Sequence, residues 1–132
     1  MNFSNRSMLG QLDGNFLDRL LGIGENRQLA AGETLCTSGD EFDGGWLVAE
    51  GRLLEQAAEG PARELTAGDV LDELQLLTAG RRAHTVVALE PSRLLLFAPD
   101  RFRALVAGDD PLLETLSTLA SERLRDAQLG QI

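Results

Sequence analysis

The chain of 132 residues has the length of one domain with a sizeable core, and its 43% hydrophobic and 25% charged residues are ordinary for a globular protein. The formal net charge is −9, and every basic residue is an arginine. Such an acidic chain repels nucleic acid and anionic membranes, so we expect it to bind neither directly. No apolar run approaches the roughly 20 residues that span a bilayer.

The N-terminal sequence lacks a basic stretch followed by an apolar core, so we expect no secretory signal. Cys36 is the only cysteine and cannot form an internal disulfide. This favours a cytoplasmic location, where thiols stay reduced.

The first expected element is a helix over residues 13–21. Four apolar residues recur there at the spacing of one helix face: Phe16, Leu17, Leu20 and Leu21. Gly22 and Gly24 follow, and glycine favours the end of a helix. We therefore assign residues 1–26 to an N-terminal helical segment.

The pattern changes between residues 27 and 98, where short apolar runs alternate with glycine-bearing turns. Turns are expected at residues 38–40, 50–52 and 59–61. The runs between them predict strands over residues 34–36, 46–49, 53–57, 64–65, 70–71, 84–89 and 92–97. Many short strands separated by turns indicate an antiparallel barrel or sandwich. Trp46 lies in one of these strands and is expected in its core.

Residues 99–132 return to a helical pattern. Pro99 with Asp100 opens one helix, and Asp110 with Pro111 opens a second, with Asp as the N-cap and Pro at the first helical position. The second helix carries an apolar stripe formed by Leu112, Leu113, Leu116, Leu119, Ala120, Leu124 and Ala127. This stripe is expected either to pack on the strands or to form a dimer.

Residues 68–87 combine the groups that a sugar phosphate would need. Glu73 stands near the start of a short apolar segment, and Arg81 and Arg82 precede a β-branched run. A carboxylate accepts from a sugar hydroxyl, a guanidinium offers two parallel N–H groups to phosphate oxygens, and free N–H groups at a helix N-terminus bind anions. Taken singly, Glu73 is more typical of an acid at a helix start, and Arg82 is more typical of a solvated arginine or a surface ion pair.

The same segment resembles the phosphate-binding cassette of cyclic nucleotide-binding domains, the family of the catabolite activator protein, the regulatory subunits of cAMP-dependent protein kinase and the cyclic nucleotide-gated channels. Residues 31–35 with Gly39 and Asp40, residues 46–53 and residues 65–71 also resemble the family, so the resemblance covers roughly residues 27–106. It implies a mainly β fold, in which residues 27–98 form an eight-stranded antiparallel β-roll and residues 99–132 the C-terminal helices. Residues 1–132 would then be a single domain.

The resemblance also implies a ligand, either cAMP or cGMP, and no cofactor. Glu73 would hold the ribose hydroxyl, Arg82 the cyclic phosphate, and the backbone N–H groups around Leu74 and Gln75 the other phosphate oxygen. The positions beside them complete the expected site: Leu71, Asp72, Arg81, Ala83, His84 and Thr85. Ala83 resembles the cAMP-type kinase domains.

Three positions depart from the family pattern. Asp72 replaces a glycine, which adds negative charge beside the phosphate and places a side chain where glycine's backbone freedom is usual. Arg81 replaces a proline and can offset that charge. His84 replaces a small residue, and it either contacts the base or is an ordinary packed histidine.

Enzymatic signals are poor. One histidine cannot build the multi-histidine metal site of catalytic β-barrels, and neither a G-x-S-x-G motif nor a P-loop is present. We therefore expect a regulatory sensor that signals through its C-terminal helices to a partner or to an output domain beyond Ile132, with a homodimer formed through residues 110–130. The alternative is a degenerate roll that binds no nucleotide and serves in dimerisation or partner docking. Asp72 favours this alternative, whereas the Glu73 and Arg82 pair favours the sensor.

Overall fold

The computed structural model describes residue 12 and residues 14–57, 60–72, 80–107, 114–119 and 121–122. The described elements are α1 (Gly14–Gly22), β1 (Glu25–Leu29), β2 (Thr34–Cys36), β3 (Gly45–Glu50), β4 (Leu53–Ala57), β5 (Arg63–Leu65), β6 (Val70–Leu71), β7 (His84–Ala88), β8 (Ser92–Phe97) and α2 (Pro99–Val106). Residues 114–119 are also helical. No helix in this part of the chain is long and apolar enough to cross a membrane.

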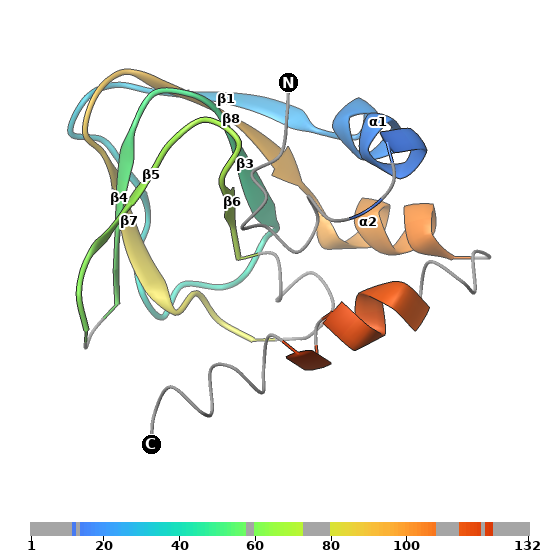
Figure 1. The fold of residues 1–132 in the computed structure, drawn as a ribbon. Helices are drawn as coiled ribbons and strands as arrows, with labels where there is room; N and C mark the ends of the chain where they lie inside the picture. Colours follow the sequence, from blue (N-terminus) through green and yellow to red (C-terminus); the bar gives the residue numbers. More distant parts are fainter. Residues whose placement is uncertain are drawn as a thin grey trace.

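The strands form two four-stranded sheets, with the orders β1-β8-β3-β6 and β2-β7-β4-β5. All of their pairings are antiparallel. The two sheets face one another to make the roll, and the helices lie beside the sheet that contains β1, β8 and β3 (Figure 1). The predicted mainly β roll with flanking helices is confirmed.

The alternation of side chains along each strand divides the core in two. In β3, Trp46 and Val48 belong to the interior of the roll, whereas Leu47 between them belongs to the core under the helices. In β6, Leu71 faces the interior and Val70 faces the helices. One sheet therefore joins both cores, and Trp46, only 3% exposed, is a core residue as predicted.

The second core is where the helices meet the roll. It combines residues of the two labelled helices with strand residues and with the helix at 114–119: Phe16, Leu20, Leu47, Val70, Leu95, Phe97, Phe102, Val106 and Leu116. Phe16 of α1 and Phe102 of α2 meet edge to face, with ring centroids 6.3 Å apart. Leu116 is completely buried, so this part of the predicted apolar stripe packs within the chain's own core.

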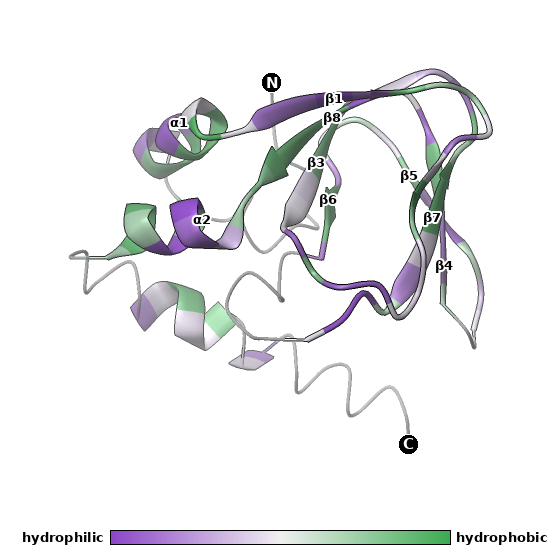
Figure 2. Ribbon diagram, turned by 180° about the vertical axis from the view of Figure 1, so that it is seen from behind, coloured by the Kyte–Doolittle hydropathy of each residue, from purple (hydrophilic) through white to green (hydrophobic). Residues whose placement is uncertain are grey.

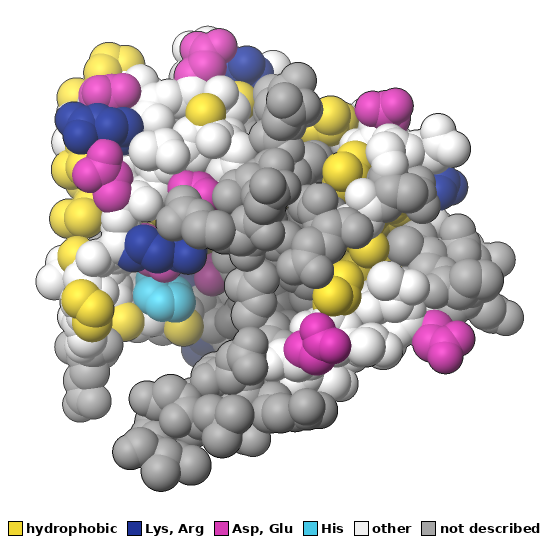
Figure 3. All heavy atoms as spheres, in the orientation of Figure 1, with side chains coloured by type: hydrophobic (Ala, Val, Ile, Leu, Met, Phe, Trp, Pro, Cys, Tyr) yellow, Lys and Arg dark blue, Asp and Glu magenta, His cyan; other side chains and the backbone are white. Residues whose placement is uncertain are grey.

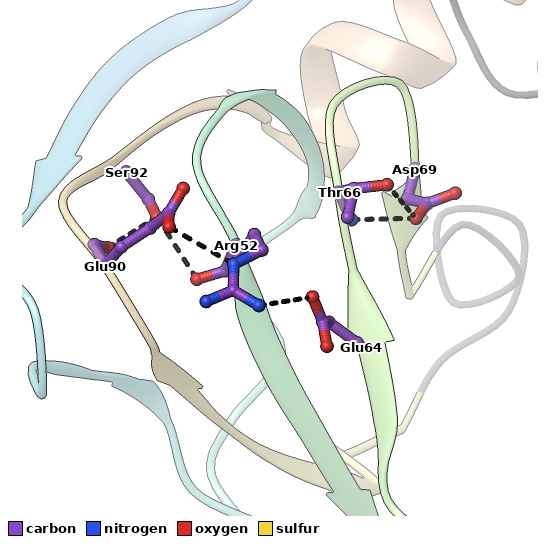
Figure 4. A network of polar contacts seen from close by, with 6 residues as sticks. All are labelled: Arg52, Glu64, Thr66, Asp69, Glu90 and Ser92. Atoms are coloured by element: carbon purple, nitrogen blue, oxygen red, sulfur yellow. Dashed lines mark hydrogen bonds and ion pairs between the residues drawn. The ribbon is translucent and has the colours of Figure 1, made fainter.

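The turn between β3 and β4 requires glycine. Gly51 has a φ of 98°, and a Cβ there would lie 2.1 Å from Ser92 Oγ. Beside this turn, Arg52 donates to Glu90 at 3.2 Å and to Glu64 at 3.0 Å (Figure 4). Asp69 accepts from the Thr66 backbone N–H at 2.9 Å and shapes the turn that leads into β6 (Figure 4).

The sequence predictions of strands were accurate from residue 34 onward but wrong about the start of the roll. The strand over residues 25–29 was not predicted, because four of its five residues are exposed and it is hydrophilic along most of its length (Figure 2). β1 exists because its backbone pairs with β8, from Glu25 opposite Leu96 to Leu29 opposite Ser92. The predicted helix starts at 99 and near 13 are confirmed, whereas the predicted cap at 110–111 lies outside the described residues.

Candidate functional site

Arg82 lies at the point where the chain enters β7 and meets the loop between β2 and β3. Its backbone N–H donates to Asp40 O at 2.9 Å, and its carbonyl accepts from the Gly39 N–H at 2.8 Å. Arg81 forms an isolated bridge with Glu41. These contacts fix the backbone of Arg82 on the 39–41 segment and direct its side chain into the protein, where it is only 1% exposed.

Within the described residues, the Arg82 guanidinium contacts two carboxylates and one aromatic ring. Nη1 donates to Asp72 Oδ2 at 2.7 Å, and Nη2 donates to Asp43 Oδ1. The Phe42 ring lies against it, with the guanidinium carbon 4.8 Å from the ring centroid. The predicted phosphate-binding arginine therefore already binds two carboxylates of its own chain.

Asp72 has a left-handed backbone conformation, which glycine adopts most readily. Its φ is 57°, and it is the one non-glycine residue with positive φ in the part of the chain that the structure describes. Aspartate adopts this left-handed conformation more readily than most residues, because its short side chain is not branched at Cβ and can hydrogen-bond locally. Asp72 thus fits the turn and places a carboxylate, 4% exposed, beside Arg82.

His84 stands at the start of β7 and faces the same carboxylate. Its Nδ1 is 4.0 Å from Asp72 Oδ1, which is longer than a hydrogen bond. This nitrogen is buried and has no hydrogen-bond partner among the residues that the structure describes. The side chain as a whole is 33% exposed. Figure 3 shows a histidine side chain with arginine and acidic side chains on one face of the molecule.

The other predicted site residues that are described serve mainly to hold the loop between β2 and β3. Arg81 is exposed and donates to Gly39 O at 3.0 Å, and Thr85 Oγ1 accepts from the Ser38 backbone N–H at 3.0 Å. Ala83 is exposed, and Leu71 is buried opposite Trp46 in the β3–β6 pairing. The predictions for Glu73, Leu74 and Gln75 lie outside the described residues.

Cys36 lies behind this site in β2. Its Sγ donates to the His84 carbonyl oxygen at 3.8 Å. The pKa of the Cys36 thiol is raised to about 11, mainly by burial; Arg82 lowers it, and the nearby Asp72 and Asp40 charges raise it. This thiol is protonated and unreactive at neutral pH.

Sequence reasoning missed Asp43 and Phe42, which lie in the loop between β2 and β3 and contact the Arg82 guanidinium. Asp43 and Arg82 are 39 positions apart, and no motif links an acid at that distance to the cassette. The one available signal was the crowding of acids at residues 40, 41 and 43, which is more often a solvated turn.

The sequence profile of the cyclic nucleotide-binding domain matches residues 26–109, which is more than half of the chain. The chain belongs to this family. The match includes every strand except the first residue of β1, together with Asp43, Asp72, Arg82 and α2. The resemblance noted in the sequence is therefore confirmed for the fold and the family.

An ion channel and a lysophospholipase each contain a region that is similar to most of this chain. The chain is 34% identical over 98 residues to a cyclic nucleotide-gated potassium channel of Rhizobium etli, a match that covers 74% of this chain and 27% of the channel. It is 30% identical over 105 residues to the lysophospholipase nte1 of Aspergillus niger, covering 75% of this chain and 7% of the lysophospholipase. The chain thus spans only a small part of these relatives.

Among solved structures, the catabolite activator protein of Thermus thermophilus is 26% identical, with a TM-score of 0.74. The similarity covers 94% of this chain and 61% of the Thermus chain. The roll and its helices are therefore arranged as in that protein.

Proposed function

We propose that this domain is a regulatory sensor that binds a cyclic mononucleotide, with Arg82 as the anchor of the cyclic phosphate. The observation that carries the proposal is the buried Arg82 guanidinium, which lies at the cassette position and already binds anionic oxygens. A phosphate oxygen has the same hydrogen-bonding character as a carboxylate oxygen, so the site has the chemistry that a cyclic phosphate requires.

The remaining contacts of the proposed ligand follow the family pattern. Glu73 would accept from the ribose hydroxyl, and backbone N–H groups around Leu74 and Gln75 would donate to the second phosphate oxygen. His84 is one-third exposed beside the Asp72 and Arg82 pair, which suits contact with the sugar or base. Ala83 favours cAMP, and titration with both nucleotides decides between them.

The proposed signal travels from β6 to the helices. Val70, two residues before Asp72, packs in the same core as Phe102 and Val106 of α2 and as Leu116. A ligand that moves the cassette would thus act directly on the packing of the helices, and binding would shift the population between two arrangements. The helices would pass this change to a partner or an output domain.

A second candidate function has support of its own. The Asp72 carboxylate lies 2.7 Å from Arg82 Nη1 in a buried pair, where a phosphate would otherwise bind. A roll in which this pair never opens would bind no nucleotide and would act in dimerisation or partner docking. The two candidates differ in one measurable property, the affinity for cAMP and cGMP.

Isothermal titration calorimetry with cAMP and cGMP tests the proposal, with 5′-AMP as a non-cyclic control. We expect saturable binding of a cyclic nucleotide, and Arg82→Ala should weaken it by about 30- to 1000-fold because the phosphate loses its charged partner. Arg81→Ala should have a much smaller effect, since Arg81 is exposed and donates to Gly39 O. Equal losses at both arginines would contradict the role of Arg82 as the anchor, and absence of binding would favour the second candidate.

A further inference from the structure

We propose that Asp43 is a displaceable counter-ion of Arg82, and that the phosphate of the ligand takes its place on Nη2 while Asp72 remains on Nη1. The inference rests on the proposed function, because it specifies how a nucleotide reaches the anchor. It assigns a role in affinity and selectivity to the loop between β2 and β3, outside the residues expected to form the site.

The exposure of the three side chains separates the two carboxylates. Arg82 is 1% exposed, so a ligand reaches it only when a group that covers it moves. Asp72 is 4% exposed, and water cannot readily take the place of its partner. Asp43 is 69% exposed, so its carboxylate can exchange Arg82 for water at little cost. Asp43 is therefore the carboxylate that leaves Arg82 when the ligand binds.

The surrounding contacts allow this exchange without unfolding the loop. Phe42 packs against the helical core and lies against the Arg82 guanidinium. These two contacts hold the backbone next to Asp43 in place. Earlier in the same loop, Gly39 and Asp40 are bound to the Arg82 backbone. On the other side of Asp43, Gly44 has a φ of 149° and packs closely against β8. A Cβ added to Gly44 would lie 2.5 Å from the Phe97 carbonyl oxygen. With Phe42 and Gly44 held on either side of Asp43, rotation of the Asp43 side chain alone releases Nη2 from its carboxylate partner.

The exchange favours a ligand with a single negative charge. When Asp43 leaves Arg82, the site loses one negative charge. The phosphodiester of a cyclic nucleotide carries one negative charge and restores the balance. A phosphomonoester carries between one and two negative charges at neutral pH, and Asp72 would repel the excess. The retained Asp72 thus selects cyclic phosphodiesters over 5′-monophosphates.

Calorimetric titration of the full chain and of Asp43→Asn with cAMP and cGMP tests the inference. The variant should bind about 3- to 10-fold more tightly, because the ligand no longer competes with a carboxylate for Nη2. Glu50→Gln is the matched control: Glu50 is 70% exposed and pairs with Arg93, and it is not among the partners of Arg82. Its affinity should stay within about twofold of the parent, since distant exposed charges are screened.

Each outcome has a definite meaning. Tighter binding by Asp43→Asn alone supports the inference, and so does binding by this variant when the parent chain binds nothing. A parent that binds, with Asp43→Asn equal or weaker, overturns the role of Asp43 and leaves the proposed function standing. Absence of binding in both overturns the proposed function and the inference together. Asp43→Ser, which also removes the charge at this exposed position, repeats the test if the first variant folds poorly.

A second readout follows the loop directly. In amide NMR spectra of the parent chain, cAMP should shift the signals of Phe42, Asp43 and Gly44, whereas 5′-AMP at the same concentration should not. Shifts caused by cAMP in the rest of the roll, with these three signals unchanged, would overturn the exchange at Asp43.

Discussion

The Arg82 guanidinium and the Asp72 carboxylate form a buried ion pair, with Nη1 2.7 Å from Oδ2. Asp72 has a left-handed backbone with φ 57°, a conformation that glycine adopts most readily. An anion of the chain itself therefore lies next to the arginine that is proposed to bind an anionic ligand. The consequences for stability and for binding can be tested separately.

Arg82→Ala should lower the free energy of unfolding by about 3–5 kcal/mol, because it leaves the Asp72 charge buried without a partner. Arg81→Ala should change it by less than about 0.5 kcal/mol, since Arg81 is exposed. Urea unfolding followed by circular dichroism measures both. Similar values for the two variants would show that the Asp72–Arg82 pair contributes little to the fold.

Asp72→Gly should tighten cyclic nucleotide binding, because it removes a negative charge beside the phosphate and suits the positive φ. Asp72→Asn separates the two causes, since asparagine also tolerates this backbone conformation but carries no charge. Calorimetry should show tighter binding by both variants. An increase with glycine only would assign the effect to the backbone, and weaker binding by both would mean that Asp72 makes a contact that the ligand needs.

Leu116→Ala should destabilise the domain by about 2–5 kcal/mol, the usual cost of a large-to-small substitution in a core. Leu116 is completely buried among residues of both labelled helices, whereas Leu119 is only partly buried at the edge of the same cluster. Leu119→Ala should therefore cost less. Equal and small losses in thermal unfolding would mean that the 114–119 helix detaches readily from the roll.

A homodimer through the C-terminal helix remains a prediction. Because Leu116 is buried within the chain, an aspartate there would disturb the fold, and Leu119→Asp is the more informative variant. Light scattering at tens of micromolar, with and without cAMP, should give the mass of a dimer for the parent and a smaller mass for the variant. A monomer under all conditions would leave the helix as a contact for another partner.

The stability of the domain should fall between about pH 9 and pH 11 through Cys36. The folded pKa of about 11 lies above the ordinary value of 9.0, so the folded state holds its proton more tightly. The stabilisation is complete below pH 9 and is lost as the pH rises to 11. The chain has neither tyrosine nor lysine, so Cys36 carries the one side chain that ordinarily titrates in this pH range.

Cys36→Ala is the control for that measurement. Urea unfolding at several pH values should show the decline in the parent and a flatter profile in the variant. A parallel decline in both would exclude Cys36 as its cause. The same raised pKa predicts slow alkylation of the native thiol by iodoacetamide at pH 8 and rapid alkylation after unfolding.

Much of the fold could be predicted from local patterns. β2, β4, β6 and β8 were predicted with the bounds that the structure has, because apolar runs and turns mark a strand wherever its side chains enter a core. The cassette could be recognised because its residues follow one another closely. β1 could not be predicted, since its exposed polar residues carry no alternating pattern and its place depends on backbone pairing with β8.

By itself, the sequence determined the family, the roll and the placement of Asp72 and Arg82 in one short segment. Only the tertiary structure decided what Arg82 binds. The side-chain direction of Arg82 follows from the backbone contacts of residues 39–41 with residues 81–82, and these contacts also bring Asp43 to the guanidinium. Pairing between segments so far apart depends on the closure of the whole roll, because no local pattern specifies which loop meets which strand.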